Sequence, residues 1–280
     1  MRKIPLLQQI ARQFALALIG LYVIIPIWSI LRLAFDASLM GRPTEFHLFP
    51  KQFSILPLLK ILDRPYQSVN FLTLFTNSMT VSIGAALAAT ILGASLAYAF
   101  ARFRFHGRSA GLFTILLTAV LPPVAFSTPL YILLSALGIR TQLIALVIVY
   151  AAFAMPFCIW NMRAAFQSVP RELEEAAMLD GAGHFFTFTN ITLPIALPSI
   201  AVAALIAFLV GYSEFTIGWL FVERADTVTL AMSIYAILMS GSAQPWSQIG
   251  SLMIVMSVPV VVVFILFQRT IFERMIFGAS

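Results

Sequence analysis

The sequence predicts an all-α integral membrane protein with six transmembrane helices. Of its 280 residues, 61% are hydrophobic and only 10% are charged, and the mean hydropathy is +0.97. Soluble domains carry roughly 25% charged residues, so a soluble core of this size could not bury so much apolar surface. Long runs without Asp, Glu, Lys or Arg recur along the chain, as membrane-spanning helices require.

Six segments have the length of about 20 mostly apolar residues that a spanning helix needs. They are 13–31, 77–100, 112–137, the stretch between Arg140 and Arg163, 193–221 and 249–267. The second span is rich in small residues, which allow helices to approach closely in lipid: Gly84, Ala85, Ala88, Ala89, Gly93 and Ala94. The chain therefore divides into a first segment with one span and an outer loop (1–70), a five-helix domain (71–268) and a short tail (269–280).

Basic residues predict the orientation of the spans. With six spans both termini share one side, and that side holds ten of the 17 Lys and Arg residues. The short segments on the other side hold only Arg140 and Arg224. Because cytoplasmic loops carry the excess of positive charge, we expect both termini to be cytoplasmic. The first apolar run is expected to be a retained span rather than a signal peptide, and the net charge of +6 reflects topology and lipid contact rather than nucleic-acid binding.

Prolines inside the spans and one short apolar segment add detail to the six predicted spans. Single prolines inside spans predict ordinary kinks, whereas Pro122-Pro123 predicts a break that lines a cavity. The apolar segment 228–239 is too short to span, so we expect it in an outer loop or at the membrane interface.

The loop 168–194 is a polar island between two apolar spans. Ser168-Val169-Pro170 is typical of a helix start, and Gly181 with Gly183 predicts a sharp end. The helix expected between them, 171–180, is about 15 Å long at 1.5 Å per residue. Its apolar face is formed by residues at spacings of three and four, and acids flank that face: Leu173, Ala176 and Ala177, with Glu172, Glu174 and Glu175.

Such a helix suits a cleft on a soluble partner, to which it can pass rigid-body motion. The alternative is an interfacial helix that only tethers two spans. Interfacial helices usually carry Lys and Arg on the polar face, whereas acids predominate here.

The spacing of this loop resembles the EAA loop of ABC-importer permeases. Glu175-Ala176-Ala177 is followed after three residues by Gly181, after nine more by Ile191, and then by Leu193-Pro194. The stretches 49–54, 98–108 and 155–173 also resemble carbohydrate permeases, so the likeness covers nearly the whole chain. It is nearest to the shorter second permease of maltose-type importers, and the implied fold is the type I, MetI-like importer fold with a cytoplasmic coupling helix.

The resemblance implies a function and a set of partners. The chain would be an inner-membrane permease subunit that passes a sugar or oligosaccharide by alternating access; a polyamine or another solute is the alternative. The implied partners are an ATPase dimer, which binds ATP and Mg, a second homologous permease, and an extracytoplasmic sugar-binding protein. The implied ATPase-coupling residues are Glu172, Leu173, Glu174, Glu175, Ala176, Ala177, Asp180 and Gly181. The tail departs from the family pattern, since only Gly278-Ala279 matches.

Glu214 is the single acid well inside an expected span. The stretch from Tyr212 to Phe215 resembles a Trp-Asn-Glu-Phe-like stretch of the family's fifth span. One interpretation is that Tyr212, Ser213 and Glu214 line the passage and bind sugar hydroxyls, because buried ionisable groups in membranes are costly and often functional. The other is that Glu214 lies near the outer interface and holds helices together.

No catalytic or metal-binding motif occurs in the sequence. There is no Gly-Lys pair of a phosphate-binding loop, and His47, His106 and His184 lack metal-ligand spacing. Cys158 lies in an apolar run and is expected to be a buried apolar side chain. We therefore expect neither enzyme activity nor a cofactor in this chain. A secondary transporter or channel is disfavoured, because no repeat and no relay of buried charges is visible.

Overall fold

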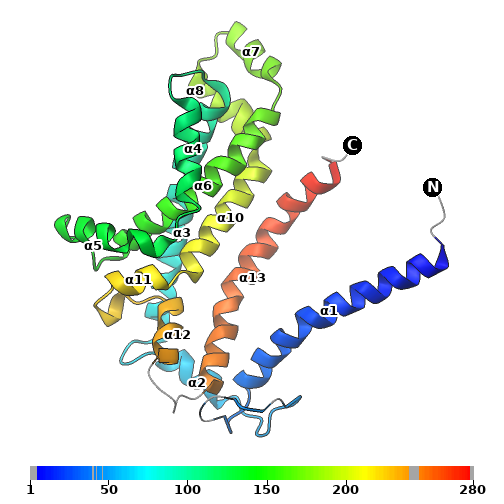
Figure 1. Cartoon of the computed structure of the whole chain (residues 1–280), viewed down its shortest axis with the longest axis vertical. Helices are drawn as coiled ribbons and strands as arrows, with labels where there is room; N and C mark the ends of the chain where they lie inside the picture. The colour runs from blue at the N-terminus through cyan, green and yellow to red at the C-terminus, as the bar shows by residue number, and fades with distance from the viewer. Residues whose placement is uncertain (1–4, 40, 42, 46, 240–245, 278–280) are drawn as a thin grey trace. The chain divides into compact units, whose positions relative to one another are not determined.

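The computed structural model describes residues 5–39, 41, 43–45, 47–239 and 246–277 (Figure 1). These residues form helices, with two isolated β-bridges and no strand among them. The chain divides into a first unit, Met1–Phe71 with Ile234–Ser257, and a second unit, Leu72–Ser233 with Val258–Ser280. The expectation of an all-α protein is confirmed for the described part of the chain.

Four helices are long and apolar enough to cross a membrane, and two bent pairs bring the number to six if each pair is one span. The long helices are α1 (Leu6–Ala34), α3 (Phe71–Arg102), α6 (Leu143–Ser168) and α13 (Trp246–Phe277). The shorter ones are α2 (Leu56–Asp63), α4 (Arg108–Thr118), η1 (Pro123–Phe126), α5 (Ser127–Ala136), α7 (Arg171–Leu179), α8 (His184–Thr187), η2 (Phe188–Thr192), α9 (Leu193–Ile195), α10 (Leu197–Ser213), α11 (Thr216–Phe221), η3 (Ala225–Thr227) and α12 (Leu230–Met239).

The span expected at 112–137 is broken in its middle, as Pro122-Pro123 predicts. Helix α4 ends at Thr118, and the pair formed with η1 and α5 is bent by 103°. Figure 1 shows α5 turned away from the direction of α4. Pro122-Pro123 lies at the break, where each proline removes an N–H donor and disfavours a helical residue before it.

The expected span 193–221 is also not one straight helix. The segment His184–Ile195 meets α10 at a bend of 81°, and α10 ends at Ser213 before the separate helix α11 begins. Pro194 and Pro198 flank this bend.

Small residues hold the second unit together. Ala85 and Ala89 of α3 are fully buried, and a side chain at Gly93 would meet Cys158 and Met162 of α6. Helix α10 approaches α3 closely at Gly211, where an added Cβ would lie 2.9 Å from the Ser82 Cα. The expectations of close packing along α3 and of a buried Cys158 are both confirmed.

Replacing Gly211 with valine is expected to destabilise the second unit. The nearest obstacle is backbone, which cannot rotate away, and overpacking of this kind costs about 1–3 kcal/mol. The matched control is Gly20→Val in α1, because a Cβ at Gly20 meets nothing within 4 Å. Thermal unfolding in detergent measures both. A Gly211→Val protein that unfolds at the temperature of the native chain would contradict this packing.

In the first unit, the loop after α1 is organised by a buried acid that sequence analysis missed. Asp36 is fully buried, and its carboxylate accepts hydrogen bonds from the backbone N–H groups of Lys51 (2.9 Å), Gln52 (3.3 Å) and Ser38 (3.1 Å) and from the Ser38 hydroxyl (2.6 Å). Burial opposes ionisation, but these hydrogen bonds outweigh it and lower the pKa of Asp36. The loop therefore closes around a carboxylate.

Replacing Asp36 with asparagine is expected to loosen this loop, because an amide reproduces these charge-assisted hydrogen bonds poorly, at a cost of about 1–3 kcal/mol. Amide hydrogen exchange at Lys51 and Gln52 should accelerate by about tenfold or more at neutral pH. The folded pKa is depressed, so the native carboxylate stabilises the loop above its unfolded pKa of about 3.9, and this contribution is lost as the pH falls through the folded value. Asp63→Asn, at an exposed site, is the control; equal exchange rates in the two variants would refute the role of Asp36.

Candidate functional site

The short helix expected in the polar loop is present as α7. It begins at Arg171, directly after Pro170, and ends at Leu179, followed by Asp180. Gly181 has a φ of +90°, a left-handed conformation that L side chains rarely adopt. Figure 1 shows α7 beyond the ends of α3, α6 and α8, at one tip of the second unit.

A buried ion pair fixes α7 to the helices beneath it. The Glu174 carboxylate accepts a hydrogen bond from Nε of Arg102 at 2.8 Å and another from the Thr192 hydroxyl at 2.5 Å. The Arg102 guanidinium also donates to the Val169 carbonyl at 2.8 Å. Both charged side chains are only 7% exposed. One glutamate of α7 is thus bonded to the end of α3 and to η2.

The ion pair between Glu174 and Arg102 changes which acids lie on the exposed side of α7. Glu174 points into the protein, so the exposed acidic flank consists of Glu172 and Glu175. The sequence alone does not distinguish the three acids, because their environments depend on partners far away along the chain. Arg102 lies 72 residues away in the sequence.

The solvent side of α7 is an apolar strip between acids, which we call the α7 outer face: Glu172, Leu173, Glu175, Ala176 and Leu179, all exposed. Leu173 is 46% and Leu179 is 88% exposed. The neighbouring Phe185 is 80% exposed, and Ala177 is half-buried. Leu179 and Phe185 were not singled out from the sequence, although large apolar residues in a polar loop were the available signal.

A small cavity of about 180 Å³ lies at the base of α7. Its lining comes from the end of α3, from α7 and from the start of α8: Tyr98, Arg102, Phe103, Arg171, Glu174, Glu175, Met178 and His184. The His184 ring stands edge-on to Phe103, with centroids 5.4 Å apart. This aromatic contact joins α8 to the end of α3, beside the polar contacts that hold α7.

The three candidate pathway residues have different surroundings in the structure. Tyr212 is buried and stacks on Phe208 with ring centroids 5.5 Å apart, whereas the exposed Ser213 donates to the Leu209 carbonyl of its own helix at 2.7 Å. Glu214 follows α10, and its carboxylate accepts the N–H groups of Ile217 (3.1 Å) and Gly218 (3.3 Å) at the start of α11. This contact favours the interpretation in which Glu214 joins two helices.

A cavity does lie beside the double-proline break. It has a volume of about 230 Å³ and is lined by Thr118, Phe126, Leu130, Val149, Ala152, Phe153 and Pro156. The rings of Phe126 and Phe153 lie 6.2 Å apart, so η1 and α6 each contribute an aromatic wall. Pro122 and Pro123 are not part of the lining: the break positions the cavity without forming its surface.

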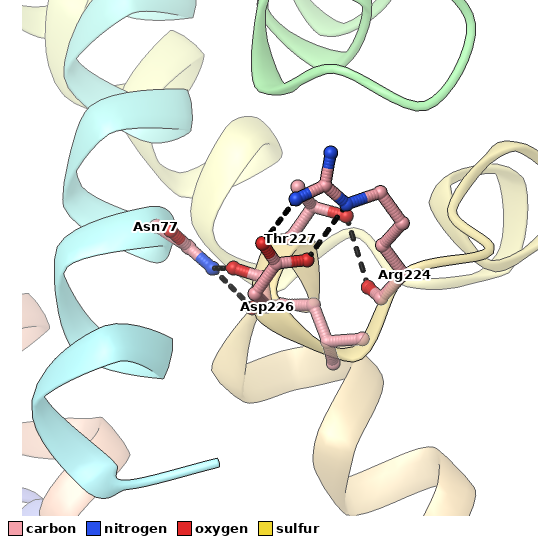
Figure 2. Close-up of polar contacts among 5 residues, drawn as sticks. Asn77, Arg224, Asp226 and Thr227 are labelled. Carbon is pink, nitrogen blue, oxygen red and sulfur yellow. Dashed lines mark hydrogen bonds and ion pairs between the residues drawn. The ribbon is translucent and has the colours of Figure 1, made fainter.

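The segment between α11 and α12 is fastened to the start of α3, as Figure 2 shows. The Asn77 amide donates to the carbonyls of Asp226 (2.7 Å) and Val228 (2.9 Å), and Arg224 forms two hydrogen bonds with the Asp226 carboxylate (3.0 and 2.6 Å). The guanidinium hydrogen bond lowers the pKa of Asp226. Sequence analysis missed Asn77, although a polar amide inside an apolar span was the available signal.

No group of three or more His, Cys, Asp or Glu side chains in the described ranges is arranged to hold a metal ion. The candidate functional features are the α7 outer face, the cavity at its base, the cavity beside Pro122-Pro123 and the outer segment fastened to α3.

Comparison with known proteins identifies the family. Residues 89–277 match the family described as binding-protein-dependent transport system inner membrane component. The maltodextrin transport system permease protein MdxG of Bacillus subtilis (strain 168) is 26% identical over 98% of this chain and 97% of its own length. The trehalose transport system permease protein SugB of Mycobacterium tuberculosis (strain CDC 1551 / Oshkosh) is 29% identical over 90% and 92%.

Solved structures show the same fold. A chain of a bacterial ABC transporter involved in the import of the acidic polysaccharide alginate superposes with a TM-score of 0.75, at 20% identity, covering 96% of this chain and 99% of that one. The family match and the relatives confirm the resemblance noted in the sequence, and the solved structure shows the fold. The chain belongs to the family of binding-protein-dependent transport system inner membrane components, and it is a multi-pass permease subunit of an ABC importer, without catalytic activity of its own.

Proposed function

We propose that this permease carries a sugar or oligosaccharide. The supporting observation is that relatives aligned over nine-tenths or more of the chain are named for maltodextrin and trehalose transport. The coupling loop alone does not separate sugar from polyamine importers, because both kinds of permease would contain it. Similarity along the whole chain does separate them, and it favours sugar.

In this proposal the α7 outer face docks into a cleft on an ATPase dimer, which binds ATP and Mg. The proposed coupling residues are Glu172, Leu173, Glu174, Glu175, Ala176, Ala177, Asp180 and Gly181. All but Glu174 act at or beside the docking surface. Glu174 acts through Arg102, because the buried ion pair makes α3 follow any displacement of α7. Closure of the ATPase dimer on ATP would open the pathway to the outer side of the membrane. ATP hydrolysis would then return the pathway to its inward-open state.

The second half of the pathway would come from a homologous permease, and solute from an extracytoplasmic binding protein. The basic-residue distribution supports placing both termini and α7 in the cytoplasm. The outer segment fastened by Asn77 would then face the binding protein. Among the proposed pathway residues, Ser213 is the exposed one and is the best placed to meet a sugar hydroxyl.

Mass spectrometry of what co-purifies with the chain from its native membrane in mild detergent tests this proposal. We expect an ATPase, a second permease and a binding protein, and we expect that binding protein to take oligosaccharides from a ligand panel. Recovery of the chain alone as a stable homo-oligomer would refute the partner assignments. A binding protein that takes polyamines and no sugar would refute the substrate assignment while leaving the partners intact.

A further inference from the structure

A cavity lies where the chain passes from α3 to α4, apart from the cavity beneath α7. Its volume is about 750 Å³, and it is lined by Phe105, His106, Gly107, Arg108, Ser109, Ala110, Leu112 and Arg163. All of these residues belong to the second unit. Two guanidinium groups, one from the start of α4 and one from α6, therefore face the same space.

These two arginines share one neutral acceptor. Nε and Nη2 of Arg108 donate to the Phe100 carbonyl at 3.0 and 2.6 Å, and Nε of Arg163 donates to the same oxygen at 3.4 Å. Within the described part of the chain, neither arginine forms an ion pair with a carboxylate, and neither do Arg104 and His106 nearby. A single carbonyl cannot neutralise two charges, and each guanidinium has five N–H donors. The cavity thus presents uncompensated positive charge and spare donors.

The start of α4 adds to this character. Gly107 precedes the helix with a φ of +79°, and no side chain caps it. The first backbone N–H groups of an α-helix lack intrahelical acceptors and carry partial positive charge. In α4 the groups left without an acceptor belong to the cavity-lining residues Ser109 and Ala110, since the Arg108 N–H donates to the Phe105 carbonyl at 3.3 Å. Backbone and side chains therefore favour the same ligand, a compact anion with several acceptor oxygens.

The surroundings indicate where such an anion would come from. Arg163 lies inside the apolar helix α6, five residues before its end, and Trp160, one turn earlier, is 56% exposed. Phe105 at the cavity and Phe113 on α4 are 47% and 67% exposed. Exposed tryptophan beside a basic residue near the end of a spanning helix is typical of the level of the lipid headgroups. If the ligand were an acidic protein surface, the exposed aromatic residues beside the cavity would have no role in binding it.

We propose that this cavity binds the phosphate of an anionic phospholipid, with Arg108 and Arg163 as its bidentate ligands and the start of α4 as a further donor. The exposed aromatic residues around the cavity would contact the glycerol and the upper acyl chain. Such a lipid would bridge α4 and α6 near the end of α6 that leads into α7, and would so stiffen the connection to α7. This site goes beyond the transport function proposed above.

Native mass spectrometry of the purified complex with phosphatidylglycerol tests the proposal. We expect phosphatidylglycerol to be retained in preference to phosphatidylcholine, and the double variant Arg108→Gln/Arg163→Gln to bind it at least about tenfold more weakly. Arg64→Gln, which removes one positive charge from an exposed site in the first unit, is the control for loss of charge as such and should bind as the native complex does. If the double variant fails to fold, the single variant Arg163→Gln still tests the proposal. Its hydrogen bond to the Phe100 carbonyl is the longest of the three, so its loss should disturb the fold least.

Three results would overturn the proposal. Equal retention of phosphatidylglycerol by the native complex and the variant would show that the arginines are not its ligands. Displacement of the lipid by inorganic phosphate at equal concentration would mean that the site takes free phosphate. Loss of the ATPase from the purified variant, with lipid retention unchanged, would assign the basic cavity to a protein contact instead.

Discussion

Replacing Glu174 with alanine should uncouple ATP hydrolysis from uptake in the reconstituted importer. The change leaves the Arg102 guanidinium buried without its carboxylate, and breaking a buried ion pair in this way typically costs about 3–5 kcal/mol. It also removes the acceptor of the Thr192 hydroxyl. With both bonds gone, α7 is no longer fixed to α3 and η2, so docking of the ATPase would move α7 without moving the spans. Uptake and ATPase rates in proteoliposomes measure the coupling.

The matched control for this prediction is Glu172→Ala, which removes an exposed acid of the same helix two residues away. Because Glu172 lies on the docking surface, we expect this change to weaken ATPase binding and to lower uptake and ATP hydrolysis together, whereas Glu174→Ala lowers the uptake per ATP hydrolysed. The double variant Arg102→Ala/Glu174→Ala should recover much of the stability lost in Glu174→Ala, because no charge is then left unpaired. If Glu174→Ala and Glu172→Ala affect the uptake per ATP hydrolysed equally, the buried pair has no role in coupling.

Replacing Gly181 with alanine should reduce uptake by about tenfold, because it strains the turn that ends α7. An L residue in the left-handed conformation costs roughly 1–2 kcal/mol, and Gly181 has a φ of +90°. Space is not the obstacle, since an added Cβ would meet nothing within 4 Å. The expected cause is therefore backbone conformation rather than bulk. Gly181→Asn should retain more activity than Gly181→Ala, since asparagine tolerates this region better.

Gly183 supplies the control for this prediction. It lies two residues away, also with open space around an added Cβ, but its φ is −78°. Gly183→Ala should therefore transport at nearly the native rate. Equal losses in Gly181→Ala and Gly183→Ala would contradict the backbone explanation and indicate that the whole turn must stay free of side chains.

The spanning helices could largely be predicted from the sequence, because a charge-free run of about 20 residues has few other stable structures. Helices α1, α3, α6 and α13 contain the expected spans. Hydropathy alone does not predict the two bends, because it averages over a window and records no direction. Pro122-Pro123 indicated the first bend, but single prolines such as Pro198 also occur in nearly straight helices, so the second carried no distinctive signal.

The candidate site was predicted as a helix but not in its orientation. Amphipathic spacing and the glycines after the helix predicted both ends of α7 to within one residue. Which glutamate faces inward depends on Arg102 and Thr192, which lie 72 and 18 residues away, and no local pattern records such a partner. The role of Asp36 could not be predicted for the same reason, since its hydrogen-bond donors Lys51 and Gln52 come from the far end of a loop.

Site-specific cross-linking from α7 tests the central claim, that this helix is the contact with the ATPase. Leu179→Cys places a reactive thiol on the α7 outer face, where the native side chain is 88% exposed, while the native Cys158 is buried. We expect a short bifunctional reagent to join Leu179→Cys to an ATPase subunit in native membranes, and to give no such product with Ile91→Cys in the middle of α3. A Leu179→Cys thiol that reacts readily with a maleimide yet yields no ATPase adduct would contradict the account.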